Sequence, residues 1–465
     1  MHSQPNNRSQ RTALRAAAEP GRWAATRTRM RQEDEVARTS ADEVCCRVSA
    51  LLILSTYFLA FLRVGFALGA DEVVAGTSTQ ALSVPVAPSS SYESLDGLLD
   101  SVRRQHNIPA MAAIVLRADT VLARGIAGVR HVGAPGSVTI QDRFQLGSNT
   151  KAVTATLLAK LIEGGTLSWT TTLADVFPEQ SASMSVAFRG VTLEQLLSHH
   201  AGVSPFTDTD DKDFKSIPRL SGSPTERRRV FTVWVLRGTP VQPPGTKAIY
   251  SNGGYTIAAS IAERVTGESW ESLVLERVFR PLGIHGTFAW SDSADVAQPW
   301  GHYETRSGVR PVDPRDPDER VPSIIWPAGS VELSLDDYAR FLQLNLRGLE
   351  GRETKLLQAA TIKHLHTPPV SPGDNFALGW GVQEFDGAPA SVHVGSAGAF
   401  YAVTIVQPTR DSQWRFSSTP AVSGRRRPRR TCSRRSSDAM RQRSGSRKLG
   451  AAQQRAAADG ASRRR

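Results

Sequence analysis

A serine and a lysine three residues apart, placed where a helix should begin, constrain this chain more than any other feature of its sequence. The chain contains eight lysines, and only Lys151 has a serine, Ser148, three positions before it. Apolar residues recur after Lys151 at helical spacing until Gly164-Gly165, which predicts a helix with Ser148 in or near its first turn. A hydroxyl and an amine on one face at the positive end of a helix can form an activated nucleophile.

The positive charge of the chain is concentrated in its C-terminal tail. The whole sequence carries a net charge of +12, and residues 425–465, with 14 Arg and one Lys against two Asp, carry +13. The remainder therefore carries −1. A basic run without interleaved aromatic residues binds nucleic acid through non-specific charge alone, so we expect no specific nucleic-acid partner.

The three cysteines, Cys45, Cys46 and Cys432, lie outside the region that we expect to be globular. This excludes a disulfide framework and a cysteine-based metal site for that region. A chain of 465 residues with 40% apolar residues can build a large core without disulfides. The cysteine pattern therefore fits a reducing compartment and an exported enzyme alike.

The first 70 residues have the composition of a targeting leader. Residues 1–47 are rich in Arg and Ala, and an apolar run follows at 48–62. That run is shorter than the roughly 20 residues of a membrane-spanning helix, and it fits a signal peptide. We expect a periplasmic or secreted protein, or one anchored in the membrane through 48–70; an organelle transit peptide is the alternative. Residues 71–90 are expected to form a Ser-, Pro- and Ala-rich linker.

The rest of the chain alternates between helical and β-type patterns. Apolar periodicity predicts helices at about 91–106, from Lys151 to Gly164, at 255–265 and at 337–346. Alternating and β-branched runs predict strands at 111–116, 120–127, 391–394 and 400–406. We interpret 166–330 as mainly helical with irregular loops, and the Pro-, Asp- and Arg-rich stretch 305–320 as a loop.

Two further short motifs follow the serine and lysine in the chain. Tyr250-Ser251-Asn252, the only Tyr-x-Asn among seven tyrosines, lies in a predicted loop, where polar side chains can point at a pocket. His393-Val394-Gly395 lies in a β-type run, where a glycine lets a ligand approach the strand backbone. Taken singly, neither motif requires a functional explanation. The first is explained by a turn with a packed tyrosine, and the second by a histidine with a structural or surface role.

The histidines give weak grounds for a metal site. His199, His200, His364 and His366 are candidate ligands, but the sequence has no His-x-x-x-His pair on a helix with a nearby glutamate. We therefore expect neither a metal nor another cofactor.

Taken in order, Ser-x-x-Lys, Tyr-x-Asn and His-x-Gly resemble the motifs of class C β-lactamases, D-alanyl-D-alanine carboxypeptidases and related esterases, a penicillin-binding-protein-like family of serine hydrolases. Longer blocks agree in the same order: FQLGSNTKAV, GTLSWTTTLADVFPE, VTLEQLLSHHAGV, PPGTKAIYSNGGYTIAASIAERVTG and GSAGAF. The resemblance covers about 91–410. It implies an α/β (α+β) fold of the β-lactamase/transpeptidase type, with an antiparallel sheet flanked by helices and a mainly helical subdomain.

The resemblance also implies roles for individual residues. Ser148 would be the nucleophile that becomes acylated, and Lys151 with Tyr250 would handle its proton. Asn252 would orient Lys151 or the substrate amide, and the backbone N–H groups of Ser148 and Ser396 would form the oxyanion hole. Lysine and tyrosine both have ordinary pKa values of about 10. Burial or a neighbouring positive charge would have to lower the pKa of the lysine, and we expect the two groups to titrate as a coupled pair.

The third motif departs from the β-lactamase form, in which a Lys-Thr pair offers an ammonium and a hydroxyl to a substrate carboxylate. His393 offers at best a partial charge near neutral pH, and Val394 offers no hydroxyl. With Gly395, His393 would instead line or orient the substrate. We therefore expect a serine hydrolase for an ester, amide or peptide-like small molecule, an esterase or D-peptidase rather than a true β-lactamase.

The C-terminal part departs further from the family. The family fold continues beyond the strand after the third motif with another strand and a long helix that packs on the sheet. After Asp411 this chain has only a basic stretch rich in Arg, Ser, Ala and Pro. We expect the domain to span 91–411 without its last strand and helix, and 412–465 to be a disordered tail that resembles an out-of-frame translation. The alternative function is then a catalytically dead or truncated family member that binds a ligand or has no function.

Overall fold

The structure is a computed structural model. It describes residues 92–117, 119–288, 297–305, 308–316, 321–369, 375–385, 387–397, 399–408 and 414–419, the last stretch as backbone only. All of them belong to one unit of the chain, which begins at Pro88. The predicted leader (1–70), the linker (71–90) and residues 420–465 lie outside the described residues. Within the described ranges, no helix is long and apolar enough to cross a membrane.

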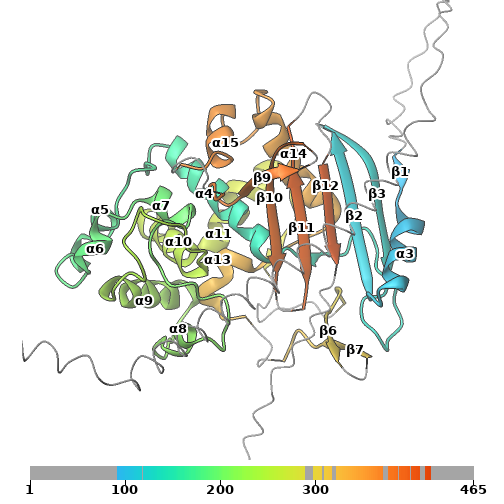
Figure 1. Ribbon diagram of the computed structural model, residues 1–465, viewed down its shortest axis with the longest axis horizontal. Helices are drawn as coiled ribbons and strands as arrows, with labels where there is room; N and C mark the ends of the chain where they lie inside the picture. The colour runs from blue at the N-terminus through green and yellow to red at the C-terminus, as the bar shows by residue number, and fades with distance from the viewer. Residues whose placement is uncertain are drawn as a thin grey trace, which may run out of the picture. The chain divides into compact units, whose positions relative to one another are not determined.

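A seven-stranded sheet forms one half of this unit (Figure 1). Its strands are β1 (Glu93–Ser94), β2 (Ala110–Arg117), β3 (Thr120–Gly128), β9 (Gly381–Phe385), β10 (Ala388–Ser396), β11 (Tyr401–Val406) and β12 (Trp414–Thr419). They lie in the order β1-β3-β2-β12-β11-β10-β9. All neighbours are antiparallel except the short β1, which pairs parallel with β3. The four predicted strands and the antiparallel sheet are confirmed.

Helices flank the sheet and build a second, mainly helical region, as predicted. The longer ones are α3 (Asp96–Gln105), α4 (Thr150–Glu163), α9 (Pro224–Arg237), α10 (Asn252–Thr266), α14 (Leu335–Leu349) and α15 (Ala359–Leu365). Shorter ones are α5 (Leu173–Val176), α6 (Val186–Arg189), α7 (Leu193–Leu197), α8 (Lys212–Lys215), α11 (Trp270–Val274), α12 (Arg280–Leu282) and α13 (Trp326–Gly329). Figure 1 shows α5 to α10 gathered beside the sheet, with α4 between them and the strands.

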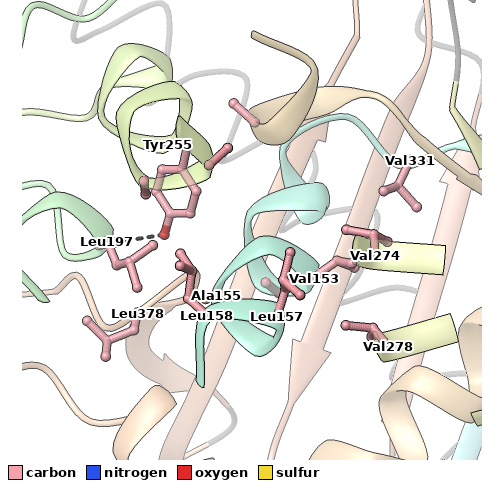
Figure 2. Close-up of a cluster of buried hydrophobic side chains, with 14 of the residues drawn as sticks. Val153, Ala155, Leu157, Leu158, Leu197, Tyr255, Val274, Val278, Val331 and Leu378 are labelled. Atoms are coloured by element: carbon pink, nitrogen blue, oxygen red, sulfur yellow. Dashed lines mark hydrogen bonds between the residues drawn. The ribbon is translucent and has the colours of Figure 1, made fainter. Parts of the chain in front are cut away.

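Helix α4 lies in the centre of the core: every residue from Thr150 to Ala159 is buried, and so is Leu161, as is typical of a helix that is covered on all sides. Its side chains point toward Tyr255 of α10 on one side and toward Val274 of α11 on the other (Figure 2). Leu157 and Leu158 are both 0% exposed, and burying a leucine contributes roughly 1.5–3 kcal/mol. The helix ends at Gly164, and Gly165 follows in the left-handed region with φ +75°.

The prediction of a loop over 305–320 is wrong in its first part. Strands β6 (Gly301–Thr305) and β7 (Gly308–Val312) form an antiparallel hairpin. Gly308 has φ +109°, a conformation that glycine adopts without strain at a tight connection. Proline in β7 suggested a loop, but a two-stranded hairpin has free edges where a residue without an N–H is tolerated.

The prediction that the domain ends at 411 without its last strand is also wrong. Strand β12 pairs with β11, where Tyr401 lies opposite Thr419, and with β2, where Trp414 lies opposite Leu116. Its position in the middle of the sheet gives its backbone hydrogen-bond partners on both sides, whatever the composition of its side chains. The predicted missing helix and the predicted disordered tail after this strand fall on 420–465, outside the described residues.

A buried ion cluster joins three helices of the helical region. Arg228 of α9 is 0% exposed and contacts Glu263 of α10 at 2.6 Å and Glu271 of α11 at 2.8 Å. Burial by itself would lower the pKa of Arg228, but hydrogen bonds from its guanidinium to the two carboxylates, together with their charge, raise it. The cluster therefore holds α9, α10 and α11 together through hydrogen bonds between one buried guanidinium and two carboxylates.

Candidate active site

Ser148 lies in a tight turn (Gly147–Asn149) that leads directly into α4. The turn is fixed from one side by β8 (Val331–Leu333), the central strand of a small sheet with β4 (Phe144–Gln145) and β5 (Thr287–Phe288). Leu146 N–H donates to the Val331 carbonyl at 2.9 Å, and Val331 N–H donates to Thr150 Oγ1 at 3.0 Å. Ser148 is partly exposed between its buried neighbours, so its hydroxyl is held and still accessible.

Lys151 is fully buried and its amine has only uncharged oxygens as partners. Nζ donates to Ser148 Oγ at 3.1 Å, to Asn252 Oδ1 at 2.8 Å and to the Ala328 carbonyl at 3.0 Å. Among the residues that the structure describes, no carboxylate bonds to it. Burial therefore holds the pKa of Lys151 well below its ordinary value. The amine is driven toward the neutral form, which can accept a proton from Ser148.

Tyr250 lies beside both groups. Its ring centre is 4.6 Å from Lys151 Nζ. Burial raises the pKa of Tyr250, and a side-chain hydrogen bond with Ser148 opposes this shift. The phenol is thus protonated at neutral pH, and its hydroxyl contacts the Ser148 side chain. The Ser148 hydroxyl therefore has two neighbours that could exchange a proton with it, the Tyr250 hydroxyl and the Lys151 amine.

Asn252 is the first residue of α10, and both ends of its side-chain amide are occupied. Oδ1 accepts from Lys151 Nζ, and Nδ2 donates to the Phe206 carbonyl at 3.0 Å. The helix start itself is capped, because Ser251 Oγ accepts from the Gly254 N–H at 3.0 Å. The Phe206 carbonyl therefore sets the orientation of the Asn252 amide, and the Asn252 Oδ1 in turn holds the Lys151 amine.

The third motif, His393-Val394-Gly395, lies against the turn that contains Ser148. A Cβ on Gly395 of β10 would lie 2.0 Å from the Leu146 carbonyl oxygen and 2.9 Å from Ser148 N. A Cβ on Gly147, whose φ is +50°, would lie 2.7 Å from Ser396 N. No other residue type fits at either glycine, and the two together bring the backbone of the turn and of β10 into contact.

The strand register directs the Ser396 N–H toward this contact. Ala397 N–H donates to the Phe400 carbonyl at 3.2 Å. In an antiparallel ladder, residues that bond to the neighbouring strand alternate with residues that do not. Ser396 is of the second kind, so its N–H points away from β11, on the side where Gly147 lies. The Ser396 N–H therefore points to the side of β10 where the turn with Ser148 lies, which is the direction that the predicted oxyanion hole requires.

His393 is 8% exposed, and burial lowers its pKa to about 3. Its Nδ1 lies 3.2 Å from the Val394 carbonyl oxygen, so in the neutral ring this nitrogen bears the proton. Val394, the next residue, is 42% exposed. This edge of the site thus offers a neutral imidazole and an apolar surface, without a fixed positive charge from these two residues.

Sequence reasoning missed two residues beside the site. His199, considered above only as a metal ligand, accepts the Ser251 N–H at its Nδ1 at 3.1 Å. Asn149 donates to the Leu146 carbonyl at 3.0 Å, and Tyr338 of α14 donates to Asn149 Oδ1 at 3.4 Å. The sequence could have pointed to Asn149 because this residue lies inside the Ser-x-x-Lys motif, and to His199 because it lies in the block VTLEQLLSHHAGV.

The four histidines weighed as metal ligands do not come together. His366 bonds to Ser391 Oγ at 2.8 Å and to Asn345 Oδ1 at 2.9 Å, and burial lowers its pKa to about 3. His364 lies 2.9 Å from a carboxylate oxygen of Glu194. In the part of the chain that the structure describes, no three His, Cys, Asp or Glu side chains gather as a metal site.

A seven-stranded sheet beside a helical region, with Ser-x-x-Lys between them, defines a β-lactamase/transpeptidase-type fold. The chain belongs to the beta-lactamase family, since the family model Beta-lactamase matches residues 95–430. The match includes β12, in agreement with the corrected C-terminal limit of the sheet.

Curated relatives place the chain among penicillin-binding proteins and β-lactamases. It is 28% identical over 318 residues to "Penicillin-binding protein 4" of Amycolatopsis lactamdurans, which covers 66% of this chain and 80% of the relative. It is 25% identical over 323 residues to "Beta-lactamase" of Escherichia coli (strain K12), covering 68% and 78%.

Solved structures show the same fold. The octameric penicillin-binding protein homologue from Pyrococcus abyssi has a TM-score of 0.57 at 21% identity, covering 70% of this chain and 73% of that one. The D-amino acid amidase from Ochrobactrum anthropi SV3, complexed with L-phenylalanine amide, has a TM-score of 0.55 at 19% identity, covering 70% and 89%. Members of this family are serine hydrolases, and the proteins named here include a β-lactamase and a D-amino acid amidase.

Proposed function

We propose that this protein is an active serine hydrolase that forms an acyl-enzyme on Ser148. The observation that carries the proposal is the distance of 3.1 Å between Lys151 Nζ and Ser148 Oγ, combined with the absence of a carboxylate partner for that amine among the described residues. A buried amine with neutral partners is a proton acceptor beside the nucleophile.

The reaction uses the groups in a fixed order. Ser148 Oγ attacks the substrate carbonyl carbon while its proton moves to Lys151, directly or through Tyr250. The carbonyl oxygen becomes an oxyanion and accepts hydrogen bonds from the N–H groups of Ser148 and Ser396. When the tetrahedral intermediate collapses, the bond to the leaving group breaks, and the leaving amine or alkoxide takes the proton. Water then repeats these steps on the acyl-serine and releases the acid.

Two contributions account for most of the expected rate enhancement. Positioned proton transfer is typically worth 10²–10⁴-fold, and one oxyanion-hole donor is worth about 10²–10³-fold. Asn252 supports the first contribution, because its Oδ1 keeps the Lys151 amine within reach of Ser148. The approach of Gly147 to β10 supports the second, because it places Ser396 N beside the turn.

The site favours an amide or ester whose group beside β10 is uncharged. The neutral His393 and the exposed Val394 offer no cation that would hold a substrate carboxylate there. Names among the similar structures point the same way, since they include the D-amino acid amidase and a D-stereospecific amidohydrolase. We infer that neutral amides, D-amino acid amides among them, and esters are better substrates than penicillins.

Labelling of Ser148 tests the proposal. A fluorophosphonate probe is expected to add one phosphonyl group to the purified protein, with the modified peptide containing Ser148 and with Ser148→Ala unlabelled. The labelled enzyme should lose hydrolysis of p-nitrophenyl esters and of D-amino acid p-nitroanilides. A folded protein that neither reacts with the probe nor hydrolyses any of these substrates would contradict the proposal and would leave the role of a non-catalytic binder.

A further inference from the structure

One segment of the chain holds the whole second motif in place. Residues 199–206, the clamp segment, run past Tyr250-Ser251-Asn252 and bond to it four times. The contacts are Ser251 N–H to His199 Nδ1 (3.1 Å), Ser251 Oγ to the Ser204 carbonyl (2.6 Å), Asn252 N–H to the Pro205 carbonyl (2.8 Å) and Asn252 Nδ2 to the Phe206 carbonyl (3.0 Å). The chemistry of the motif therefore depends on the conformation of this segment.

The clamp segment is strained at both ends. His199 has φ +68° and Phe206 has φ +48°, and only one other non-glycine residue in the described part of the chain, Asn107, has a positive φ. Such conformations cost about 1–3 kcal/mol each and persist where the surroundings determine them. The ring of Phe206 explains part of this constraint, since a Cβ on Gly253 of α10 would lie 2.5 Å from it.

His199 is the clamp residue that meets the site with its side chain. It is 4% exposed, and its ring centre lies 4.5 Å from that of Tyr250 and 5.1 Å from that of Phe376. Its backbone carbonyl accepts the Ile249 N–H at 2.8 Å. His199 thus touches the residues on both sides of the tyrosine as well as the tyrosine itself.

The protonation state of His199 follows from its partner. Ser251 N–H is a donor, so Nδ1 must accept and the ring proton must lie on Nε2. Burial lowers the pKa of His199 well below its ordinary value. The ring therefore stays neutral and keeps its acceptor at neutral pH.

We propose that His199 is a positioning residue: its unprotonated Nδ1 and its ring fix Tyr250 against Ser148 and Lys151. The inference rests on the proposed function for its catalytic consequence. Without the acceptor, the N–H of Ser251, a residue 2% exposed, would be buried and unpaired, and the loop would shift to relieve it. A shift of about 1 Å in such a constellation can lower the rate 10²-fold.

Two substitutions separate the two contributions of the side chain. His199→Phe keeps an aromatic ring and removes the acceptor, whereas His199→Asn keeps an acceptor near the Nδ1 position and tolerates a positive φ. His200→Asn is the matched control, because His200 is the next residue in the chain, is also buried, and has its Nδ1 3.2 Å from Ser198 Oγ.

Three measurements are made on each variant: the rate of Ser148 acylation by the fluorophosphonate probe, kcat and KM for an ester, and hydrogen exchange of the Ser251 amide. We expect His199→Phe to lower acylation and kcat about 10²-fold, with little change in KM and with faster exchange at Ser251. His199→Asn should retain most of the rate and the slow exchange, and His200→Asn should match the unmodified protein.

The proposal is overturned if His199→Phe acylates at the unmodified rate, or if both His199 variants lose the rate equally while the Ser251 amide stays protected. If the unmodified protein does not react with the probe, the proposed function is contradicted. Hydrogen exchange of the Ser251 amide in the His199 variants still tests whether His199 holds the loop. If His199→Phe does not fold, nitrogen NMR of the unmodified protein decides, since a proton on Nδ1 of His199 would exclude the acceptor role.

Discussion

Helix α10 connects two buried basic side chains whose surroundings are opposite. Its first residue, Asn252, contacts the Lys151 amine, and Glu263, near its last turn, contacts the Arg228 guanidinium. Both basic side chains are 0% exposed. Arg228 has two carboxylate partners, whereas Lys151 has a hydroxyl, an amide oxygen and a backbone carbonyl.

The difference in partners sends the two pKa values in opposite directions. Carboxylates raise the pKa of Arg228 against the effect of burial, and burial without carboxylates lowers the pKa of Lys151. A buried cation with paired anions is a structural element, and breaking it is costly. A buried amine without them is destabilised in its charged form, which makes it a base. Helix α10 thus contacts a stabilising ion cluster near its last turn, through Glu263, and the proposed base Lys151 at its first residue, Asn252.

Replacing Lys151 should give the largest effect on the chemistry. In Lys151→Met the proton acceptor is lost, so we expect acylation of Ser148 to fall about 10³-fold. The free energy of unfolding should be unchanged or higher, because a desolvated amine is replaced by an apolar chain. Probe kinetics and urea denaturation measure the two quantities.

Lys160→Met is the control for Lys151→Met, because Lys160 lies on the same helix and its amine bonds to the Leu356 carbonyl, at 3.2 Å. It should leave acylation unchanged. A Lys151→Met protein that loses several kcal/mol of stability and keeps its acylation rate would show that Lys151, like Arg228, is structural.

Replacing Arg228 should give the reverse result. In Arg228→Met the buried carboxylate of Glu263 loses its cationic partner and keeps only the hydrogen bonds from Thr225 Oγ1 and the Trp270 N–H, so we expect the free energy of unfolding to fall by about 3–5 kcal/mol. The protein that remains folded should acylate within about 10-fold of the unmodified rate, since Arg228 does not contact the site. Denaturation curves and probe kinetics on the same sample measure both.

The neighbouring Arg229→Met is the control for Arg228→Met: Arg229 is exposed, and the change should stay within about 0.5 kcal/mol. Adding Glu263→Gln to Arg228→Met should restore part of the stability, because it removes the unpaired charge. If the free energy of unfolding of Arg228→Met is unchanged, Arg228 does not stabilise the fold and the contrast with Lys151 fails.

A single substitution should give Lys151 the surroundings of Arg228. Asn252→Asp places a carboxylate where an amide oxygen now lies 2.8 Å from Nζ, which raises the pKa of Lys151. At neutral pH the amine is then protonated, and we expect acylation to fall about 10²-fold.

The pH dependence of acylation checks the cause. The rate should rise with pH as Lys151 loses its proton, and because burial lowers its pKa, this rise lies well below pH 10 in the unmodified protein. In Asn252→Asp it should move to higher pH. Asn252→Ala, which removes the bond without adding charge, should be slower without that alkaline shift, and equal profiles in all three proteins would refute the comparison.

Much of the fold was predictable because local patterns determine it. The apolar positions after Lys151 correctly predicted α4, and the apolar run of β2 followed by the β-type run of β3 correctly predicted a hairpin. The predictions failed at β7 and β12, where Pro, Arg or Ser residues hid a strand whose existence depends on backbone pairing with neighbours. For β12 these neighbours are β2 and β11, and β2 lies about 300 residues earlier in the chain.

For the site, the sequence by itself determined the chemical groups: Ser148, Lys151, Tyr250 and Asn252 are identifiable from short motifs, since each spacing is local. Only the tertiary structure decided their state. The partners of Lys151 come from α10 and from α13, and the clamp on Ser251 comes from residue 199. Burial and the charges of distant segments set a pKa, and sequence spacing contains no information about either.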